Sequence, residues 1–215
     1  MIFHTIQQST WDRKEIFEHF LQQNTTFSIT HELDITLLQR YISTSPYRFY
    51  PAFIYLVTQV INTHNHFRMS ITPEGELGYW SHLHPSYTIF DKSSTLFSAI
   101  HTEMQPTFAA FYYAFLQDHK QYANRGQLSP KQPTPPNCFP ISMLPWVSFT
   151  GFKLNIGNNA SFLFPIITAG KFFERGNAIY LPLSLQVHHA VCDGYHAAYF
   201  INTLQEMMNT PEKFL

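Results

Sequence analysis

The sequence predicts an α/β fold, specifically an α+β two-layer sandwich in which helices lie mainly on one face of a mixed β-sheet. Runs with helical periodicity alternate along the chain with short strand-like runs. The last strand-like run, residues 178–189, leads directly into a helix-like run, residues 194–208. No repeat and no domain-boundary linker interrupts this pattern. We therefore expect residues 1–215 to form a single domain.

The first helix is expected over residues 12–23. Asp12 and Glu15 have the spacing of a capping box. Its apolar stripe is formed by Ile16, Phe17, Phe20 and Leu21.

Three elements follow. Residues 25–30 predict a short strand and residues 34–42 a short helix. The buried side of that helix is expected to hold Leu38, Tyr41 and Ile42. Residues 50–62 are apolar nearly all round, and Pro51 stands where a first helical turn tolerates it. We therefore expect a buried helix there.

The middle of the chain mixes strands with a long helix. Residues 67–80 predict a hairpin that turns at 73–75, and residues 86–90 predict another strand. Residues 106–123 predict the long helix. The segment 128–140 carries five prolines, which predicts an extended loop.

The C-terminal third predicts three strands and a helix. The strands are expected over 141–149, 162–172 and 178–189, and a hairpin signal at 173–177 joins the last two. The helix over 194–208 is expected to bury Ala197, Phe200, Ile201, Leu204 and Met208.

Composition narrows the class of protein. Thirteen basic and 14 acidic residues give a net charge of −1 without a basic block, so nucleic acid is not an expected partner. The start has no signal-peptide pattern, and the longest apolar run, 108–116, is too short to cross a membrane. We expect a cytoplasmic protein with no membrane partner. Charged residues are only 13% of the chain, about half the usual share, which hints at an oligomer.

Two adjacent histidines end the last strand. Strand side chains alternate between faces, so His189 shares a face with Leu181, Leu183, Leu185 and Val187, whereas Ser184, Gln186 and His188 share the other. Asp193 follows at the N-cap of the final helix. Partial burial at such a junction favours a neutral imidazole, which a general base requires.

Other interpretations of these residues stay open at this point. A histidine on an apolar strand face is more often a satisfied core residue, and Asp193 can be a simple cap or a salt-bridge partner. His189, Asp193 and His196 could converge on a metal ion, but their spacing matches no standard zinc motif, so we expect no metal. The Asp193 carboxylate disfavours a Cys192 thiolate, which makes that thiol a poor nucleophile.

Residues 186–206, QVHHAVCDGYHAAYFINTLQE, closely resemble the signature of the chloramphenicol acetyltransferase family, type A. The His-x-x-x-Asp-Gly core alone is shared with other acyl-CoA acyltransferases, including the catalytic domains of dihydrolipoamide acyltransferases. Further blocks resemble the family in order, such as those at 11–20, 47–62, 141–159 and 162–172. The resemblance covers almost the whole chain and implies a fold like that of CoA-dependent acyltransferases.

The resemblance implies a reaction. The family transfers acetyl from acetyl-CoA, a co-substrate, to the 3-hydroxyl of chloramphenicol, which gives antibiotic resistance; no permanently bound cofactor is implied. By resemblance His189 is the general base, Ser142 donates to the oxyanion, and Thr168 helps to hold the transition state through water. Asp193 is implied to pair with Arg13 and so to brace the turn that orients the imidazole, with its proton on Nδ1.

The resemblance also implies binding residues and an assembly. The chloramphenicol pocket matches Phe20, Phe27, Phe97, Phe152, Leu154 and Ile166. Phe20 stands where some members have a tyrosine that bonds the substrate. The blocks that face CoA contain Arg48, Tyr50, Trp146 and Lys171. The family forms homotrimers in which the histidine comes from one subunit and most of the drug pocket from its neighbour.

Two other functions stay in view. One is an acyltransferase of the same fold that acts on a different alcohol or thiol acceptor. The other is a trimeric binding module without activity, against which the presence of His189, Ser142 and Thr168 argues.

Overall fold

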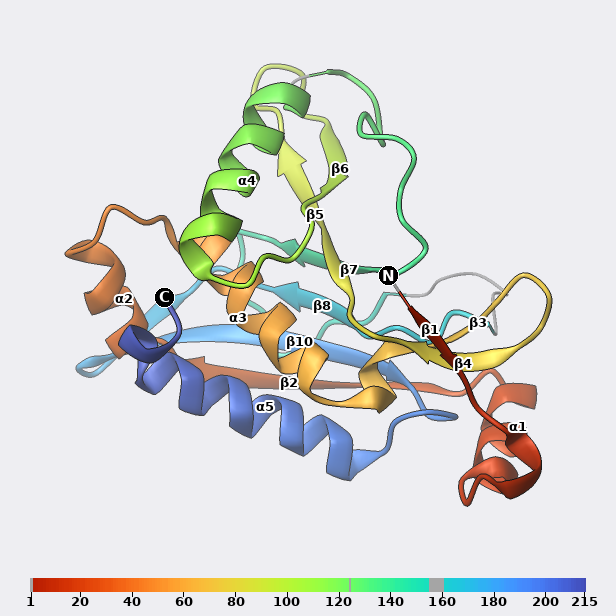
Figure 1. The fold of residues 1–215 in the computed structure, drawn as a ribbon. Coiled ribbons are helices and arrows are strands. Elements are labelled where there is room, and N and C mark those ends of the chain that lie inside the picture. The colour runs from red at the N-terminus through yellow and green to blue at the C-terminus, as the bar shows by residue number, and fades with distance from the viewer. Residues whose placement is uncertain (1, 124, 155–160) are drawn as a thin grey trace.

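The computed structural model describes residues 2–123, 125–154 and 161–215, and it forms two main layers (Figure 1). Its helices are α1 (Lys14–Gln22), α2 (Thr36–Ser43), α3 (Phe49–Thr63), α4 (Phe108–Tyr122) and α5 (Gly194–Asn209), with short 3₁₀ segments η1 (Gln8–Thr10), η2 (Asn65–Arg68) and η3 (Pro211–Lys213). Its strands are β1 (Phe3–Thr5), β2 (Thr26–Asp34), β3 (Met69–Ile71), β4 (Leu77–Trp80), β5 (His84–Phe90), β6 (Phe97–His101), β7 (Cys138–Met143), β8 (Ile166–Ala169), β9 (Phe173–Arg175) and β10 (Ala178–His188).

The main sheet is mixed, as the sequence predicts. Its strands run in the order β2-β10-β8-β7-β5-β6, and β9 pairs with β10. The β5–β7 and β7–β8 pairs are parallel, whereas the other pairs are antiparallel. A small second sheet has the order β1-β4-β3.

The core lies between the main sheet and the helices. Figure 1 shows α3, α4 and α5 on the same side of the strands, and α3 packs against both α4 and α5. The β10 side chains Leu181, Leu183, Leu185 and Val187 are buried here. The expected apolar stripe of α5 is confirmed, because all five of its predicted core residues are buried. Helix α3 is buried along most of its length, also as predicted.

The other face of β10 is buried too, although it carries polar side chains. The Ser184 hydroxyl donates to the carbonyl of Phe152 at 2.8 Å. The Gln186 amide donates to the carbonyl of Leu154 at 2.7 Å and accepts from its N–H at 2.9 Å. Residues 152–154 therefore cover this face. Their backbone groups supply the hydrogen bonds that the buried side chains of Ser184 and Gln186 need.

The start of α1 corrects one prediction. The helix begins at Lys14 after an Arg13 N-cap that has no side-chain capping bond, so the expected capping box of Asp12 and Glu15 is wrong. The Arg13 side chain instead reaches across the molecule to the turn before α5. Of the predicted stripe, Phe17 is buried but Ile16 is exposed.

Several strand boundaries also differ. Strand β2 extends to Asp34 because it pairs along its whole length with β10. Strand β7 begins at Cys138, within the predicted loop 128–140, and ends at Met143 rather than at residue 149. Strand β8 covers only Ile166–Ala169 of the predicted 162–172. Residues 173–175 of the hairpin signal form strand β9 itself.

The other local predictions hold in part: on the expected buried side of α2, Leu38 is buried, whereas Tyr41 and Ile42 are only partly buried. The hairpin turn at 73–75 places Gly75 at φ 88°, which glycine adopts without strain. Strands β1 and β6 are present although the sequence did not indicate them. Within the described residues, none of the helices has the length and apolar character needed to cross a membrane.

Candidate active site

His189 follows the last residue of β10, where the chain turns toward α5. Its ring stacks on that of Phe20 with centroids 4.0 Å apart and meets the Phe27 ring edge-on at 5.2 Å. Its backbone N–H donates to the carbonyl of Thr25 at 2.8 Å. The imidazole is therefore half-buried at a strand-to-helix junction, as predicted.

The His189 ring is oriented by its own turn. Its Nδ1 lies 3.1 Å from the carbonyl oxygen of Cys192. A carbonyl can only accept a hydrogen bond, so this contact places the proton on Nδ1 and leaves the lone pair on Nε2.

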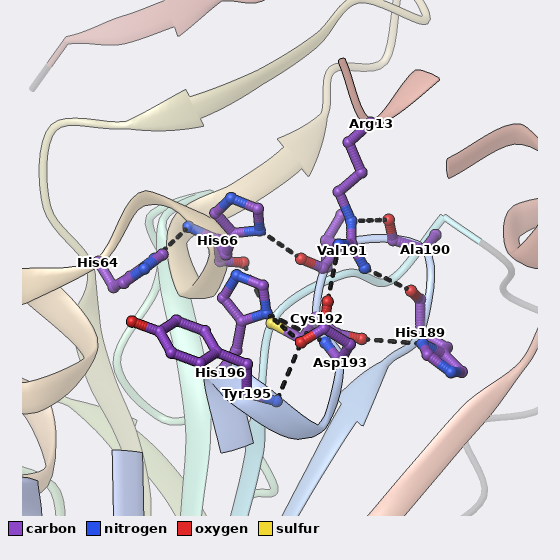
Figure 2. A network of polar contacts seen from close by, with 10 residues as sticks. All are labelled: Arg13, His64, His66, His189, Ala190, Val191, Cys192, Asp193, Tyr195 and His196. Carbon is purple, nitrogen blue, oxygen red and sulfur yellow. Dashed lines mark hydrogen bonds and ion pairs between the residues drawn. The ribbon is translucent and has the colours of Figure 1, made fainter. Parts of the chain in front are cut away.

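Arg13, the residue before α1, holds this turn together (Figure 2). Its guanidinium donates to the Asp193 carboxylate at 3.0 Å, to the Ala190 carbonyl at 3.0 Å and to the His189 carbonyl at 3.1 Å. The arginine side chain is only 12% exposed. The expected Arg13–Asp193 ion pair is therefore present, and the same guanidinium also holds the backbone of His189.

Asp193 has a second structural task. Its carboxylate accepts from the backbone N–H of Tyr195 at 3.0 Å, which caps α5 as predicted, and it lies 2.9 Å from Nδ1 of His196. Burial, the largest single effect on the Asp193 pKa, raises it; the hydrogen bonds and charges of Arg13 and His196 together outweigh burial and lower the pKa to about 2. The carboxyl is therefore ionised at neutral pH.

Cys192, inside the same turn, is unsuited to nucleophilic chemistry. The side chain is buried, and burial is the main reason why the pKa of its thiol is raised; Asp193 adds to this effect, and Arg13 opposes it.

Ser142 and Thr168 stand side by side on β7 and β8. They are register partners in the parallel ladder, and their hydroxyl oxygens are 3.4 Å apart. Thr168 is in turn the register partner of Ser184 on β10. Cross-strand partners share a face, so these hydroxyls form a row on the sheet face that carries Ser184.

A large apolar cavity opens beside this row. It measures about 720 Å³ and is lined by residues of β5, β6, β7 and β8 together with the segment after β7. The predicted site residues that line it are Tyr50, Phe97, Ser142, Trp146, Leu154 and Ile166. His189, Phe20 and Phe27 are absent from this lining.

The match to known proteins decides the family. The family model described as chloramphenicol acetyltransferase matches residues 1–205. This chain belongs to the chloramphenicol acetyltransferase family.

Named relatives cover the chain from end to end. A chloramphenicol acetyltransferase of Staphylococcus aureus is 55% identical over 215 residues, which is 100% of both chains. Another, of Clostridium butyricum, is 45% identical over 216 residues and covers 100% of this chain and 99% of its own. The chain is thus similar to acetyltransferases along its whole length.

Solved structures confirm the fold. A chloramphenicol acetyltransferase structure superimposes with a TM-score of 0.87 at 21% identity and covers 96% of this chain and 100% of its own. The dihydrolipoamide acetyltransferase of Azotobacter vinelandii gives a TM-score of 0.69 at 17% identity, with 93% and 87% covered. The fold is therefore the one shared by chloramphenicol acetyltransferases and dihydrolipoamide acyltransferases.

Within this acetyltransferase chain, the predicted residues fall into two groups. Arg13, Phe20, Phe27 and Asp193 gather around His189. Ser142, with Thr168 beside it, belongs to the cavity group. The Phe152 ring does not line the cavity; it packs on Phe149 at 5.5 Å, while its carbonyl holds Ser184.

Of the four residues predicted to face CoA, Tyr50 and Trp146 line the cavity, whereas Arg48 and Lys171 do not. The Tyr50 hydroxyl is already committed to the Thr88 carbonyl at 3.2 Å. Trp146 is 61% exposed and meets Phe90 edge-on at 4.7 Å. Lys171 is exposed, and its backbone N–H donates to the Val147 carbonyl at 2.8 Å.

Arg48 precedes α3 and is exposed. Its charge acts on a residue of the cavity lining: burial is the first cause of a lowered pKa at His119, and Arg48 is the second.

His119 and Phe90 line the cavity, although the sequence did not indicate them. Neither carries a local signal, because a histidine on α4 and a strand-end phenylalanine meet only in the folded chain. The matched block 141–159 extends beyond the described residues at its end.

The metal arrangement considered from the sequence does not form. His196 groups with His64 and His66 on one side of the turn, whereas the His189 ring points away on the other side (Figure 2).

Proposed function

We propose that this chain is a chloramphenicol O-acetyltransferase, which transfers acetyl from acetyl-CoA to the 3-hydroxyl of the antibiotic and so confers resistance. Family membership over the full length supports the substrate and the reaction class. The observation that carries the mechanism is the contact of His189 Nδ1 with the Cys192 carbonyl at 3.1 Å. It leaves Nε2 as the free basic nitrogen.

The reaction proceeds by direct transfer. Nε2 of His189 takes the proton of the chloramphenicol hydroxyl while the oxygen attacks the thioester carbonyl of acetyl-CoA. The tetrahedral intermediate then collapses and expels the CoA thiolate. The imidazolium returns the proton to that sulfur, so the products are the acetyl ester and free CoA, and the imidazole is neutral again.

Ser142 stabilises the oxyanion of the intermediate. Its hydroxyl lines the cavity and has the Thr168 hydroxyl 3.4 Å away. A donor already placed where charge develops lowers the barrier without reorganisation. Thr168 is almost fully buried, so it acts through Ser142 or through a water.

Arg13 and Asp193 are positioning residues. Three of the guanidinium bonds end on the turn that carries the imidazole, and one of them ends on the backbone of His189 itself. This brace keeps the ring where Nδ1 meets the Cys192 carbonyl. Asp193 contributes to this brace as the ionised partner of Arg13 and as the N-cap of α5.

The complete site forms between subunits of a homotrimer. Within one chain, the His189 group does not line the cavity that holds Ser142. The cavity also leaves large apolar side chains open to solvent: Phe97 is 55% exposed and Leu154 46%. A neighbouring subunit that presents His189, Phe20 and Phe27 to this cavity would cover them and complete the pocket.

The CoA end of the site lies at the rim of the same cavity. Arg48 and Lys171 supply positive charge for the CoA phosphates, and exposed Trp146 offers an aromatic surface for the adenine or the pantetheine arm. Tyr50 contributes its ring, since its hydroxyl is used by Thr88.

Release of free CoA thiol from acetyl-CoA tests this function. We expect release that depends on chloramphenicol and a product esterified at the 3-hydroxyl, with no release when that hydroxyl is already acetylated. Turnover with another alcohol or thiol but none with chloramphenicol would instead indicate a same-fold acyltransferase of different acceptor class. Drug binding without turnover of any acceptor would indicate a binding module.

A further inference from the structure

Three histidines gather on the side of the turn opposite to His189 (Figure 2). His64 is the residue after α3, His66 lies in η2, and His196 is in the first turn of α5. One nitrogen from each of the three lies within 4.8 Å of the others. The rings of His66 and His196 stack at 4.1 Å, and the His64 ring is 5.0 Å and 5.1 Å from them.

One of these rings is already oriented as metal ligands usually are. Nδ1 of His66 lies 2.6 Å from the Val191 carbonyl, which favours the proton on Nδ1 and so leaves the lone pair on Nε2. Nδ1 of His196 lies 2.9 Å from the Asp193 carboxylate and also 3.2 Å from the backbone N–H of Asp193, so an ion bound at Nε2 would select the tautomer that donates to the carboxylate. Metal-bound imidazoles commonly donate their second nitrogen to a carbonyl or carboxylate in this way.

The third ring is loosely held. Nδ1 of His64 accepts from the backbone N–H of His66 at 3.4 Å, which is long for a hydrogen bond. Little is lost if this contact breaks when the ring turns to present a lone pair to an ion.

The nearby guanidinium groups are occupied: Arg13 binds Asp193, and Arg68 binds Asn65 and the carbonyls of Trp80 and Ser81.

There is also room for a further ligand. His64 and His66 line a cavity of about 500 Å³, bounded as well by Trp11 and Met69. A water molecule entering from this cavity could complete a four-coordinate site. The nearest thiol, Cys192, is buried and donates to the His66 carbonyl at 3.6 Å.

We propose that His64, His66 and His196 form a binding site for one divalent transition-metal ion of the zinc type. Three imidazoles plus water is a ligand set that Zn²⁺ accepts, with zinc–nitrogen distances of about 2.0–2.1 Å. In tetrahedral geometry such distances bring the ligand nitrogens to about 3.3 Å from one another, so the rings must close from the present limit of 4.8 Å. This closure requires side-chain rotation, which for His64 breaks only the 3.4 Å contact with the His66 N–H. None of the three histidines takes part in a step of acetyl transfer, although His196 contacts the positioning residue Asp193.

Binding of Zn²⁺ by calorimetry to the full-length protein, first stripped with a chelator, tests this site. We expect one ion per chain and a rise in melting temperature with added Zn²⁺, because an ion that binds only the folded state stabilises it. His64→Gln and His66→Gln should each weaken Zn²⁺ binding at least roughly 10-fold. Loss of a residue that only supports a metal ligand already costs about 10- to 100-fold in affinity, so loss of a ligand itself should cost no less. His31→Gln, at an exposed histidine of β2, is the matched control and should bind as the wild type does.

Visible absorption of the Co²⁺ form gives a second measurement that does not depend on any one variant. Strong ligand-field bands indicate four-coordinate imidazole ligation, and they should be lost in both His64→Gln and His66→Gln. Melting curves without metal show whether each variant is folded. Absence of Zn²⁺ binding at micromolar concentrations, or equal binding by folded His64→Gln and His66→Gln, would overturn the proposal.

Discussion

Nδ1 of His189 and the carbonyl oxygen of Cys192 are 3.1 Å apart, so the imidazole is fixed by a residue only three positions along the chain. The turn that makes this contact is held from outside by Arg13, which bonds the carbonyls of His189 and Ala190 as well as Asp193. Local and long-range contacts thus fix the orientation of the imidazole ring.

The first prediction concerns the base itself. His189→Ala should lower kcat by several decades, because general base catalysis alone contributes about 10²–10⁴-fold and the remaining groups do not replace it. Chloramphenicol binding should stay nearly unchanged. Steady-state kinetics and calorimetry measure the two effects, and a loss of only a few-fold in kcat would remove His189 from this role.

The second prediction concerns the oxyanion donor. Ser142→Ala should reduce kcat roughly 10²-fold, the usual effect of losing one such donor. Ser184→Ala is the matched control on the same row of hydroxyls, since Ser184 donates to the Phe152 carbonyl and does not line the cavity. It should affect stability more than kcat. Equal kcat values for Ser142→Ala and wild type would reject the assignment.

The third prediction concerns the brace. Arg13→Lys should lower the free energy of unfolding by about 2 kcal/mol, because a single ammonium cannot reproduce the guanidinium fork and charged hydrogen bonds are worth about 1.5–3 kcal/mol each. It should also lower kcat more than it raises KM.

Asp193→Asn keeps a capping side chain but loses the charge, and it should reduce both activity and stability.

Lys14→Gln is the control for the brace. Lys14 pairs with Glu18 at 3.8 Å on the exposed face of the same helix, and such surface pairs contribute little. If Asp193→Asn abolished activity while the melting temperature stayed unchanged, the carboxylate would have a direct chemical role instead of a structural one.

The fourth prediction concerns pH. His84 is buried and accepts from the Met104 N–H at 2.9 Å. Burial first, and then His82 and His101, lower its pKa to about 4, while Glu103 opposes the shift. Between pH 6.5 and about 4, His84 is protonated in the unfolded chain but neutral in the folded protein. The contribution of His84 to stability should therefore fall as the pH is lowered through this window and level off below it.

The size of that loss is measurable. One pKa unit corresponds to about 1.4 kcal/mol, so the pKa of about 4 at His84 implies a loss of roughly 3 kcal/mol across the window. Urea unfolding at several pH values measures it. His84→Asn should flatten the dependence, and His31→Asn should not; an unchanged slope in His84→Asn would contradict the explanation.

The sequence predicted the elements that have strong periodicity. Helix α5, the apolar helix α3, the hairpin at Gly75 and the mixed sheet all follow from patterns along the chain, and the whole-chain resemblance predicted the pairing of Arg13 with Asp193. No spacing rule could have found that pair, because 180 positions separate its members.

Other features depend on contacts that a local pattern does not contain. Strand β7 was placed too late because Pro140 lies inside it, and proline normally argues against a strand within a sheet. Strand β1 has only three residues, too few for a periodic signal. The His64 and His66 pair is visible in the sequence, but its third member, His196, joins it only through the packing of α5 near the end of α3.

Assembly of the site across two subunits is tested most directly by mixing two inactive chains. In hybrid trimers of His189→Ala and Ser142→Ala chains, a site that takes its histidine from one chain and its serine from the neighbour can be fully wild type. An equal random mixture should then recover about a quarter of the wild-type activity, since a closed ring of three gives each site two independent chains. Recovery no greater than the residual activity of the two variants alone would show that His189 and Ser142 act within one chain, and it would contradict the proposed site.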